Sequence, residues 1–147
     1  MGFFSRLLNK LTNSTQPKIQ LSGPESFEYK IADEAKYQRA LETICGGRTE
    51  EGIKKNVQAI LIPEHYNPDD KNAIRVAIQG QTVGYLSKIN AKEYRNKLKA
   101  AGYSARPAAC SAVIVGGWDR GLLDKGHFGV KLDLPVRGKL IAKEMHG

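Results

Sequence analysis

Cysteine and histidine are scarce in this sequence, which limits the chemistry that it can support. The two cysteines, Cys45 and Cys110, lie far apart, neither belongs to a Cys-x-x-Cys pair, and there are three histidines. Structural zinc sites use about four such ligands clustered at short spacings, so we expect no metal and no cofactor. A catalytic triad can assemble from distant positions, but no histidine has a Ser or Cys partner at an interpretable spacing. We therefore expect a protein that is not an enzyme.

Long apolar runs are also absent. A transmembrane helix needs about 18 or more consecutive apolar residues, and the apolar N-terminal stretch is interrupted by Arg6 and Lys10. We expect neither a secretory signal nor a membrane-spanning segment. Together with the unpaired cysteines, this predicts a reducing, cytoplasmic location in which both thiols pack as small apolar groups.

Acidic residues are few relative to basic ones. Lysine and arginine total 23, against 15 aspartates and glutamates, for a formal net charge of +8. Such a surplus favours polyanionic partners, and both nucleic acid and an anionic membrane surface fit it. The alternative is charge that serves only solubility. The length of 147 residues and the hydrophobic fraction of 41% are typical of one folded domain.

The two ends of the chain differ from its middle. Four apolar residues near the start have helical spacing, namely Phe4, Leu7, Leu8 and Leu11. They predict a short amphipathic helix, which either docks on the domain or frays, or else makes a weak contact with a membrane or a partner protein. We expect an N-terminal amphipathic extension and linker at residues 1–22, a folded domain at 23–134 and a basic C-terminal tail at 135–147.

Alternation and helical spacing divide the middle of the chain into strands and helices. The strands are expected at residues 27–31, 57–62, 74–78, 83–86, 108–115 and 128–134. Two apolar stripes predict helices at residues 37–45 and 91–101, and residues 48–56 are expected to be a loop. Asp33 is the expected cap of the first helix, and Asn90 with Glu93 forms a capping box for the second. The pattern predicts a mainly β fold, a small OB-like or SH3-like β-barrel of about six strands with two flanking α-helices.

The segment 86–106 has the strongest local charge bias, with six basic residues against one acid, Glu93. Lys92 and Arg95 share one face of the predicted helix, and Lys88 continues this face just before the helix begins. The face is predicted to contact phosphates without regard to base sequence, so neutralising these three residues should weaken binding and reduce its salt dependence. The alternative is a solvated helix surface.

The loop at residues 64–73 contains carboxylates, which repel phosphate. The simplest interpretation is turn chemistry, because Asn and Asp side chains bond their own backbone and Pro68 stiffens the bend. A metal site at His65, Asp69 and Asp70 is a weaker alternative, since adjacent aspartates in a tight turn seldom converge on one ion.

Two linked motifs extend from this loop into the next hairpin. The first is E-x-x-N-P-x-D-x-N-A-I-R-V, from Glu64 to Val76, and the second is G-x-x-V-G-Y-L, from Gly80 to Leu86. They resemble the core of the HIRAN domain family, and the flanks resemble its stand-alone bacterial members, over about residues 25–134. A gapped match of this length, with turn and apolar residues both in register, is more specific than a single short motif.

The resemblance implies an oligonucleotide-binding barrel that holds the 3′-hydroxyl end of single-stranded DNA. In the family, the Asp of the N-P-x-D motif accepts a hydrogen bond from the terminal hydroxyl. That residue is Asp70 in this chain, and Asn67 begins the same motif. The lysine shortly after the next strand contacts phosphate, and here it is Lys88. Because the family is often fused to DNA-remodelling ATPases, a separate helicase or remodelling ATPase is an expected partner.

One position departs from the family pattern. The family usually has an aromatic residue between the proline and the aspartate, where it stacks on a base, and this chain has Asp69. Stacking contributes about 1–3 kcal/mol per base, so its loss implies weaker binding. Tyr66, Tyr85 and Tyr37 are the candidates to replace it, and each is equally expected as a residue of the barrel wall.

The residues and the resemblance together predict a single-stranded DNA-binding module that recognises the 3′-hydroxyl end, in DNA repair or replication-fork processing. The alternative is a protein-interaction or membrane-recruited adaptor that keeps the barrel but lacks 3′-end recognition. The missing aromatic residue and the apolar N-terminal segment favour that alternative.

Overall fold

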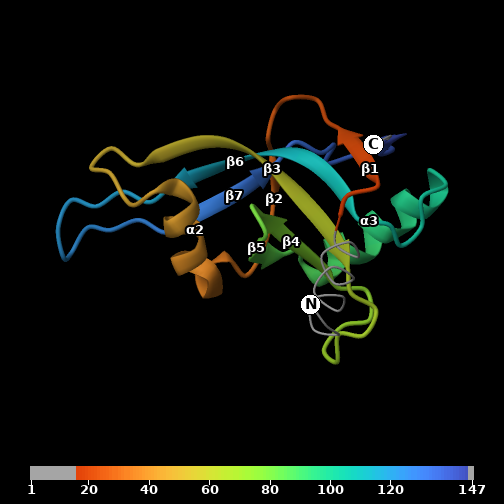
Figure 1. Cartoon of the computed structure of the whole chain (residues 1–147), viewed down its shortest axis with the longest axis horizontal. Helices are drawn as coiled ribbons and strands as arrows, with labels where there is room; N and C mark the ends of the chain where they lie inside the picture. Colours follow the sequence, from red (N-terminus) through yellow and green to blue (C-terminus); the bar gives the residue numbers. More distant parts are fainter. Residues whose placement is uncertain (1–15, 146–147) are drawn as a thin grey trace, which may run out of the picture.

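The computed structural model describes residues 16–145, which form one curled sheet with two α-helices and a short 3₁₀ helix (Figure 1). The strands are β1 (Ile19–Ser22), β2 (Tyr29–Lys30), β3 (Ile53–Pro63), β4 (Ile74–Ile78), β5 (Gln81–Tyr85), β6 (Ala108–Gly116), β7 (Phe128–Leu132) and β8 (Ile141–Glu144). The helices are η1 (Glu34–Tyr37), α2 (Gln38–Cys45) and α3 (Lys88–Ala100). The helix predicted around Phe4 to Leu11 lies outside the described residues.

The sheet follows the strand order β2-β7-β6-β3-β4-β5, and every pair along this path is antiparallel. β1 adds to β6 in parallel and pairs with β8 in the antiparallel direction. The two ends of the path meet at an antiparallel bridge between Ala32, just after β2, and Tyr85 of β5. Their backbones exchange two hydrogen bonds, with N···O distances of 2.7 and 3.0 Å.

The bridge explains a glycine of the second motif. A Cβ atom on Gly84 would lie 2.6 Å from the carbonyl oxygen of Ala32, so a side chain there would push the two ends of the curl apart. The hairpin before it turns at Gln79 and Gly80, which both have positive φ, as the favoured two-residue hairpin turns require. These residues therefore fix the position of Tyr85.

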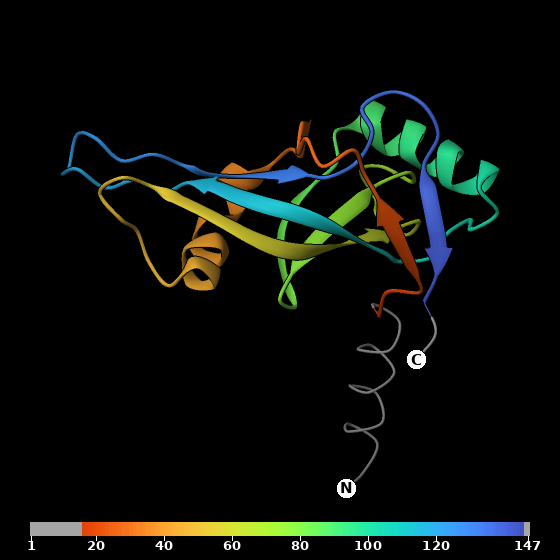
Figure 2. The same ribbon diagram turned by 90° about the horizontal axis from the view of Figure 1, so that it is seen from above.

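The core lies on the inner face of the curl, where α2 and α3 pack. In β3 the residues alternate, with Val57, Ala59 and Leu61 turned toward the core and Lys54 and Asn56 exposed on the other face. The residues predicted to supply the barrel core are all buried, namely Ile74, Val76, Ile78, Val83 and Leu86. In the view from above in Figure 2, β3, β6 and β7 lie in front of α2.

The structure confirms a mainly β fold with two α-helices and corrects the number of strands, which is eight in residues 16–145. β1 and β8 had not been predicted, because strands of four residues at opposite ends of the chain show little periodicity. β3 begins at Ile53, so the expected loop at 48–56 is wrong for its last four residues. Those residues pair with Val113 to Gly116 of β6, a distant partner.

The predicted helix caps are wrong in detail. Ser87 caps α3, since its Oγ accepts a hydrogen bond from the backbone N–H of Asn90 at 3.2 Å, and the helix therefore begins before the expected capping box. Asp33 has a left-handed backbone with φ of 64° and its side chain makes no capping bond; it precedes the 3₁₀ turn η1 instead.

None of the helices that the structure describes is long and apolar enough to cross a membrane.

Candidate nucleic-acid interface

A cleft of about 280 Å³ lies where η1, the loop at 64–73, the end of β5 and the start of α3 meet. Its lining residues are Asp33, Lys36, Tyr37, Asn67, Asp69, Asp70, Ala73, Tyr85, Leu86 and Lys88. The fold thus brings together five of the residues predicted from the sequence, namely Tyr37, Asn67, Asp70, Tyr85 and Lys88. Tyr66, Lys92 and Arg95 do not line it.

A buried carboxylate, Glu64, holds the loop in place. The residue is only 8% exposed, and it accepts hydrogen bonds from the amide of Asn67 at 3.1 Å, the hydroxyl of Tyr85 at 3.0 Å and Nε of Arg75 at 2.9 Å. Arg75 also donates to the hydroxyl of Thr82 at 3.1 Å. A buried charge is tolerated when it is paired and hydrogen-bonded, so the first residue of the motif has a structural role.

Asp70 is preorganised by its own turn. Its Oδ1 accepts a hydrogen bond from the backbone N–H of Asn72 at 2.9 Å, and its carbonyl oxygen accepts one from the N–H of Ala73 at 3.1 Å. Within residues 16–145, no hydrogen bond reaches its Oδ2. A carboxylate oxygen is an acceptor only, so Asp70 presents an acceptor to a donor that enters the cleft.

Arg95 ties this loop to α3. Its guanidinium donates to the carbonyl oxygen of Asn72 at 2.9 Å and to that of Ala73 at 3.2 Å. Burial lowers the pKa of Arg95 from its ordinary value, and the nearby charge of Asp70 opposes that shift. The sequence predicted a phosphate contact at Arg95, whereas the structure places it against the back of the loop, where it supports Asp70.

Two tyrosines form the wall of the cleft. The ring centroids of Tyr37 and Tyr85 lie 6.5 Å apart with their planes tilted by 45°. Burial, followed by the hydrogen bond to Glu64, raises the pKa of Tyr85 to about 12. Tyr66, by contrast, is 76% exposed and lies edge-on to His65. The structure therefore offers Tyr37 and Tyr85, but not Tyr66, as aromatic surface inside the cleft.

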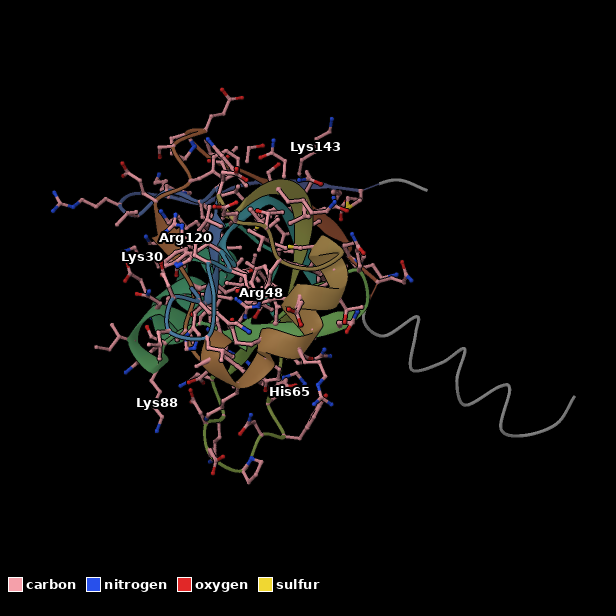
Figure 3. All side chains as sticks on the ribbon, turned by 90° about the vertical axis from the view of Figure 1, so that its left-hand side faces the viewer. Lys30, Arg48, His65, Lys88, Arg120 and Lys143 are labelled. Atoms are coloured by element: carbon pink, nitrogen blue, oxygen red, sulfur yellow. The ribbon has the colours of Figure 1, made fainter. Side chains whose placement is uncertain are left out.

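The charges in the cleft are mixed. Asp33, Asp69 and Asp70 provide three carboxylates, and Lys36 and Lys88 provide two amines. Lys36 lies 4.0 Å from Asp33, whereas Lys88 is exposed and has no ion-pair partner among the described residues. Figure 3 shows Lys88 extending outward at the lower left of the view, with His65 near the bottom centre. Lys88 is thus the amine in the cleft that is most available to a ligand phosphate.

Five lining residues had not been predicted as site residues, and two of them, Asp33 and Lys36, lie outside the two linked motifs. Asp33 and Lys36 reach the cleft because the segment after β2 crosses to β5 at the Ala32 bridge and then turns into η1. Nothing in their local sequence indicates this, since the signal is a contact between distant segments. Lys92, one turn after Lys88 on α3, is exposed outside the cleft.

Metal ligands do not cluster in the part of the chain that the structure describes. No three His, Cys, Asp or Glu side chains there are close enough to share an ion, and this includes His65, Asp69 and Asp70.

No family model, no curated protein and no solved structure matches the chain.

Proposed function

We propose that this protein is a single-stranded DNA-binding module that recognises the 3′-hydroxyl end of a strand, on an OB-like barrel. The observation that supports this most directly is the position of Asp70, which lines one cleft with Lys88 and two tyrosines. Its Oδ2 accepts no hydrogen bond from the residues that the structure describes. The six-strand path whose ends meet at the Ala32–Tyr85 bridge supports the barrel assignment.

The chemistry of the cleft fits an end better than an internal nucleotide. A terminal 3′-hydroxyl donates a hydrogen bond to a carboxylate, whereas an internal phosphate at the same point is repelled by Asp69 and Asp70. Lys88 lines the same cleft and has no ion-pair partner among the described residues, so its amine is available to bind the phosphate that precedes the terminal sugar. Tyr37 and Tyr85 supply the apolar wall for that sugar or its base, in place of the aromatic residue that Asp69 replaces.

In this proposal the module binds the strand end, and a partner protein supplies ATP-driven movement along DNA. The module acts in DNA repair or replication-fork processing, in a cytoplasmic location, by delivering a 3′ end to a separate helicase or remodelling ATPase.

The unaltered protein should prefer a 3′-hydroxyl oligonucleotide over its 3′-phosphate counterpart by about tenfold or more. A hydrogen bond to a charged acceptor contributes about 1.5–3 kcal/mol, and about 1.4 kcal/mol corresponds to tenfold in affinity. Fluorescence anisotropy at matched salt measures both affinities. Lys88→Gln should weaken binding of both ligands, with Lys143→Gln as the control that removes an equal charge from an exposed residue far from the cleft (Figure 3). Equal affinity of the unaltered protein for the two ends would refute end recognition.

A second candidate function, a protein-interaction adaptor, is favoured by a separate observation. The loop between β6 and β7, at the far left of Figure 1, exposes two adjacent leucines, Leu122 at 93% and Leu123 at 102%. Two hydrogen bonds hold the loop in place. The indole of Trp118 donates to the carboxylate of Asp124 at 2.9 Å, and the guanidinium of Arg48 donates to the carbonyl oxygen of Gly126 at 2.6 Å. A loop that is held by these hydrogen bonds and presents apolar side chains to solvent is suited to an apolar pocket of a partner.

Replacing both leucines by serine tests the adaptor. Leu122→Ser/Leu123→Ser should leave oligonucleotide affinity unchanged, because the loop lies outside the cleft, but should abolish co-purification of a protein that the unaltered chain and the Asp70→Asn variant both retain. Quantitative mass spectrometry of affinity-purified material compares the three proteins. An identical set of co-purifying proteins from all three would exclude the leucines as a partner contact.

A further inference from the structure

The outer face of the sheet has a cationic surface that the cleft does not explain. Register places Lys30, Lys131, Val113 and Asn56 in one row across β2, β7, β6 and β3, and Lys54 lies two residues before Asn56. Lys54 and Asn56 are exposed. This face is opposite to the one on which α2 packs, and Figure 2 shows the three long strands there with no helix in front of them.

The row contains an unfavourable pair. Lys30 and Lys131 are direct cross-strand partners, and like charges directly opposite each other destabilise a sheet. Among residues 16–145, neither they nor Lys54 has an ion-pair partner within 4.0 Å. Neither core packing nor ion pairing within the described residues explains why these three amines lie close together. Binding of an anionic ligand would explain it, because the ligand would offset their mutual repulsion.

An aromatic side chain lies beside the lysines. A hollow of about 580 Å³ is lined by Phe27 together with Lys54, Asn56 and Lys131, and Glu25 is the one acid among its lining residues. Phe27 has a left-handed backbone with φ of 51°, which is uncommon for a bulky residue. Aromatic surface between lysines is the combination with which proteins bind single-stranded nucleic acid, by stacking a base and contacting the backbone.

We propose that this outer surface, defined by Phe27, Lys30, Lys54 and Lys131, binds internal nucleotides of a single strand independently of its end. The inference rests on the proposed function for the nature of the ligand, but it does not require the 3′ end. Lys30 and the cleft residue Asp33 are three residues apart, at most about 11 Å along an extended chain, so one strand can reach both surfaces. Lys30 and Lys88 are also on the same side of the molecule in Figure 3.

A circularised oligothymidylate separates this surface from the cleft, because it has phosphates and bases but no 3′ end. The unaltered protein should bind the circle, and Lys54→Gln/Lys131→Gln should weaken that binding about tenfold near 0.1 M salt. The slope of log affinity against log salt should fall by about 1.4, which is about 0.7 for each phosphate that a lysine no longer neutralises. Arg137→Gln/Lys139→Gln removes the same charge from exposed residues elsewhere and should change neither value.

The aromatic contribution has its own variant. Phe27→Leu keeps an apolar side chain in the hollow and removes the stacking surface, so affinity for the circle should fall about fivefold or more. If the circle does not bind while the linear 3′-hydroxyl strand does, this proposal is overturned and the cleft proposal stands. An equal loss of affinity for the circle in Lys54→Gln/Lys131→Gln and in Arg137→Gln/Lys139→Gln would also overturn it. Binding of neither ligand would overturn both proposals.

Discussion

Asp70→Asn should abolish the preference of this protein for a 3′-hydroxyl over a 3′-phosphate. An asparagine keeps the turn, because its side-chain oxygen still accepts from the N–H of Asn72. It replaces the free acceptor with an amide that donates, and it removes the charge that repels a terminal phosphate. The ratio of the two affinities should therefore fall from about tenfold or more to about one. Anisotropy titrations at matched salt give this ratio directly.

Asp69→Asn is the matched control for that result. It removes the same charge one residue earlier in the same cleft, and Asp69 is exposed. Affinity for both oligonucleotides should rise by similar factors, because a general repulsion of phosphate is relieved, and the ratio between them should remain. If Asp69→Asn abolished the preference as completely as Asp70→Asn, the selectivity would come from the overall negative potential of the cleft, and the specific role of Asp70 would be excluded.

Glu64→Ala should lower the free energy of unfolding by about 3 kcal/mol. The substitution leaves the guanidinium of Arg75, whose side chain is 21% exposed, with only the hydroxyl of Thr82, and it removes the acceptor of Tyr85 and Asn67. Removing one partner of a buried ion pair costs about 3–5 kcal/mol, and partial solvent access to Arg75 places the expected value at the lower end. Urea unfolding measures the change in the free energy of unfolding.

Glu42→Ala provides the comparison, because Glu42 makes an ion pair of the same length, 2.9 Å, with Arg48. Its side chain is 45% exposed, and exposed pairs contribute about 0–1 kcal/mol. Its loss should therefore leave the unfolding midpoint nearly unchanged. Equal and small effects of the two substitutions would show that Glu64 does not anchor the loop. Glu64→Ala should also weaken oligonucleotide binding, since Asn67 and Tyr85 would each be without the acceptor that orients them.

The role of Arg95 shows where helical spacing misleads. On the helix it shares a face with Lys92, and sequence alone suggests that the two act together. The structure instead places the guanidinium of Arg95 on two loop carbonyls while Lys92 is exposed. The difference arises because the loop at 64–73 packs against α3 beside Arg95. The spacing of residues along a helix gives no information about where a distant loop packs.

The alternating segments, the two helices and the turn residues of the motif could be predicted from the sequence, because they depend on interactions within a few residues. The sequence predicted in this way a mainly β fold with buried Ile74, Val76 and Ile78. Which distant residues meet became apparent only from the folded arrangement of the chain. The pairing of β2 with β7 placed Lys30 opposite Lys131, and the Ala32–Tyr85 bridge brought Asp33 to the cleft of Asp70. Contacts between distant segments depend on how the whole sheet curls, so no local pattern in the chain encodes them.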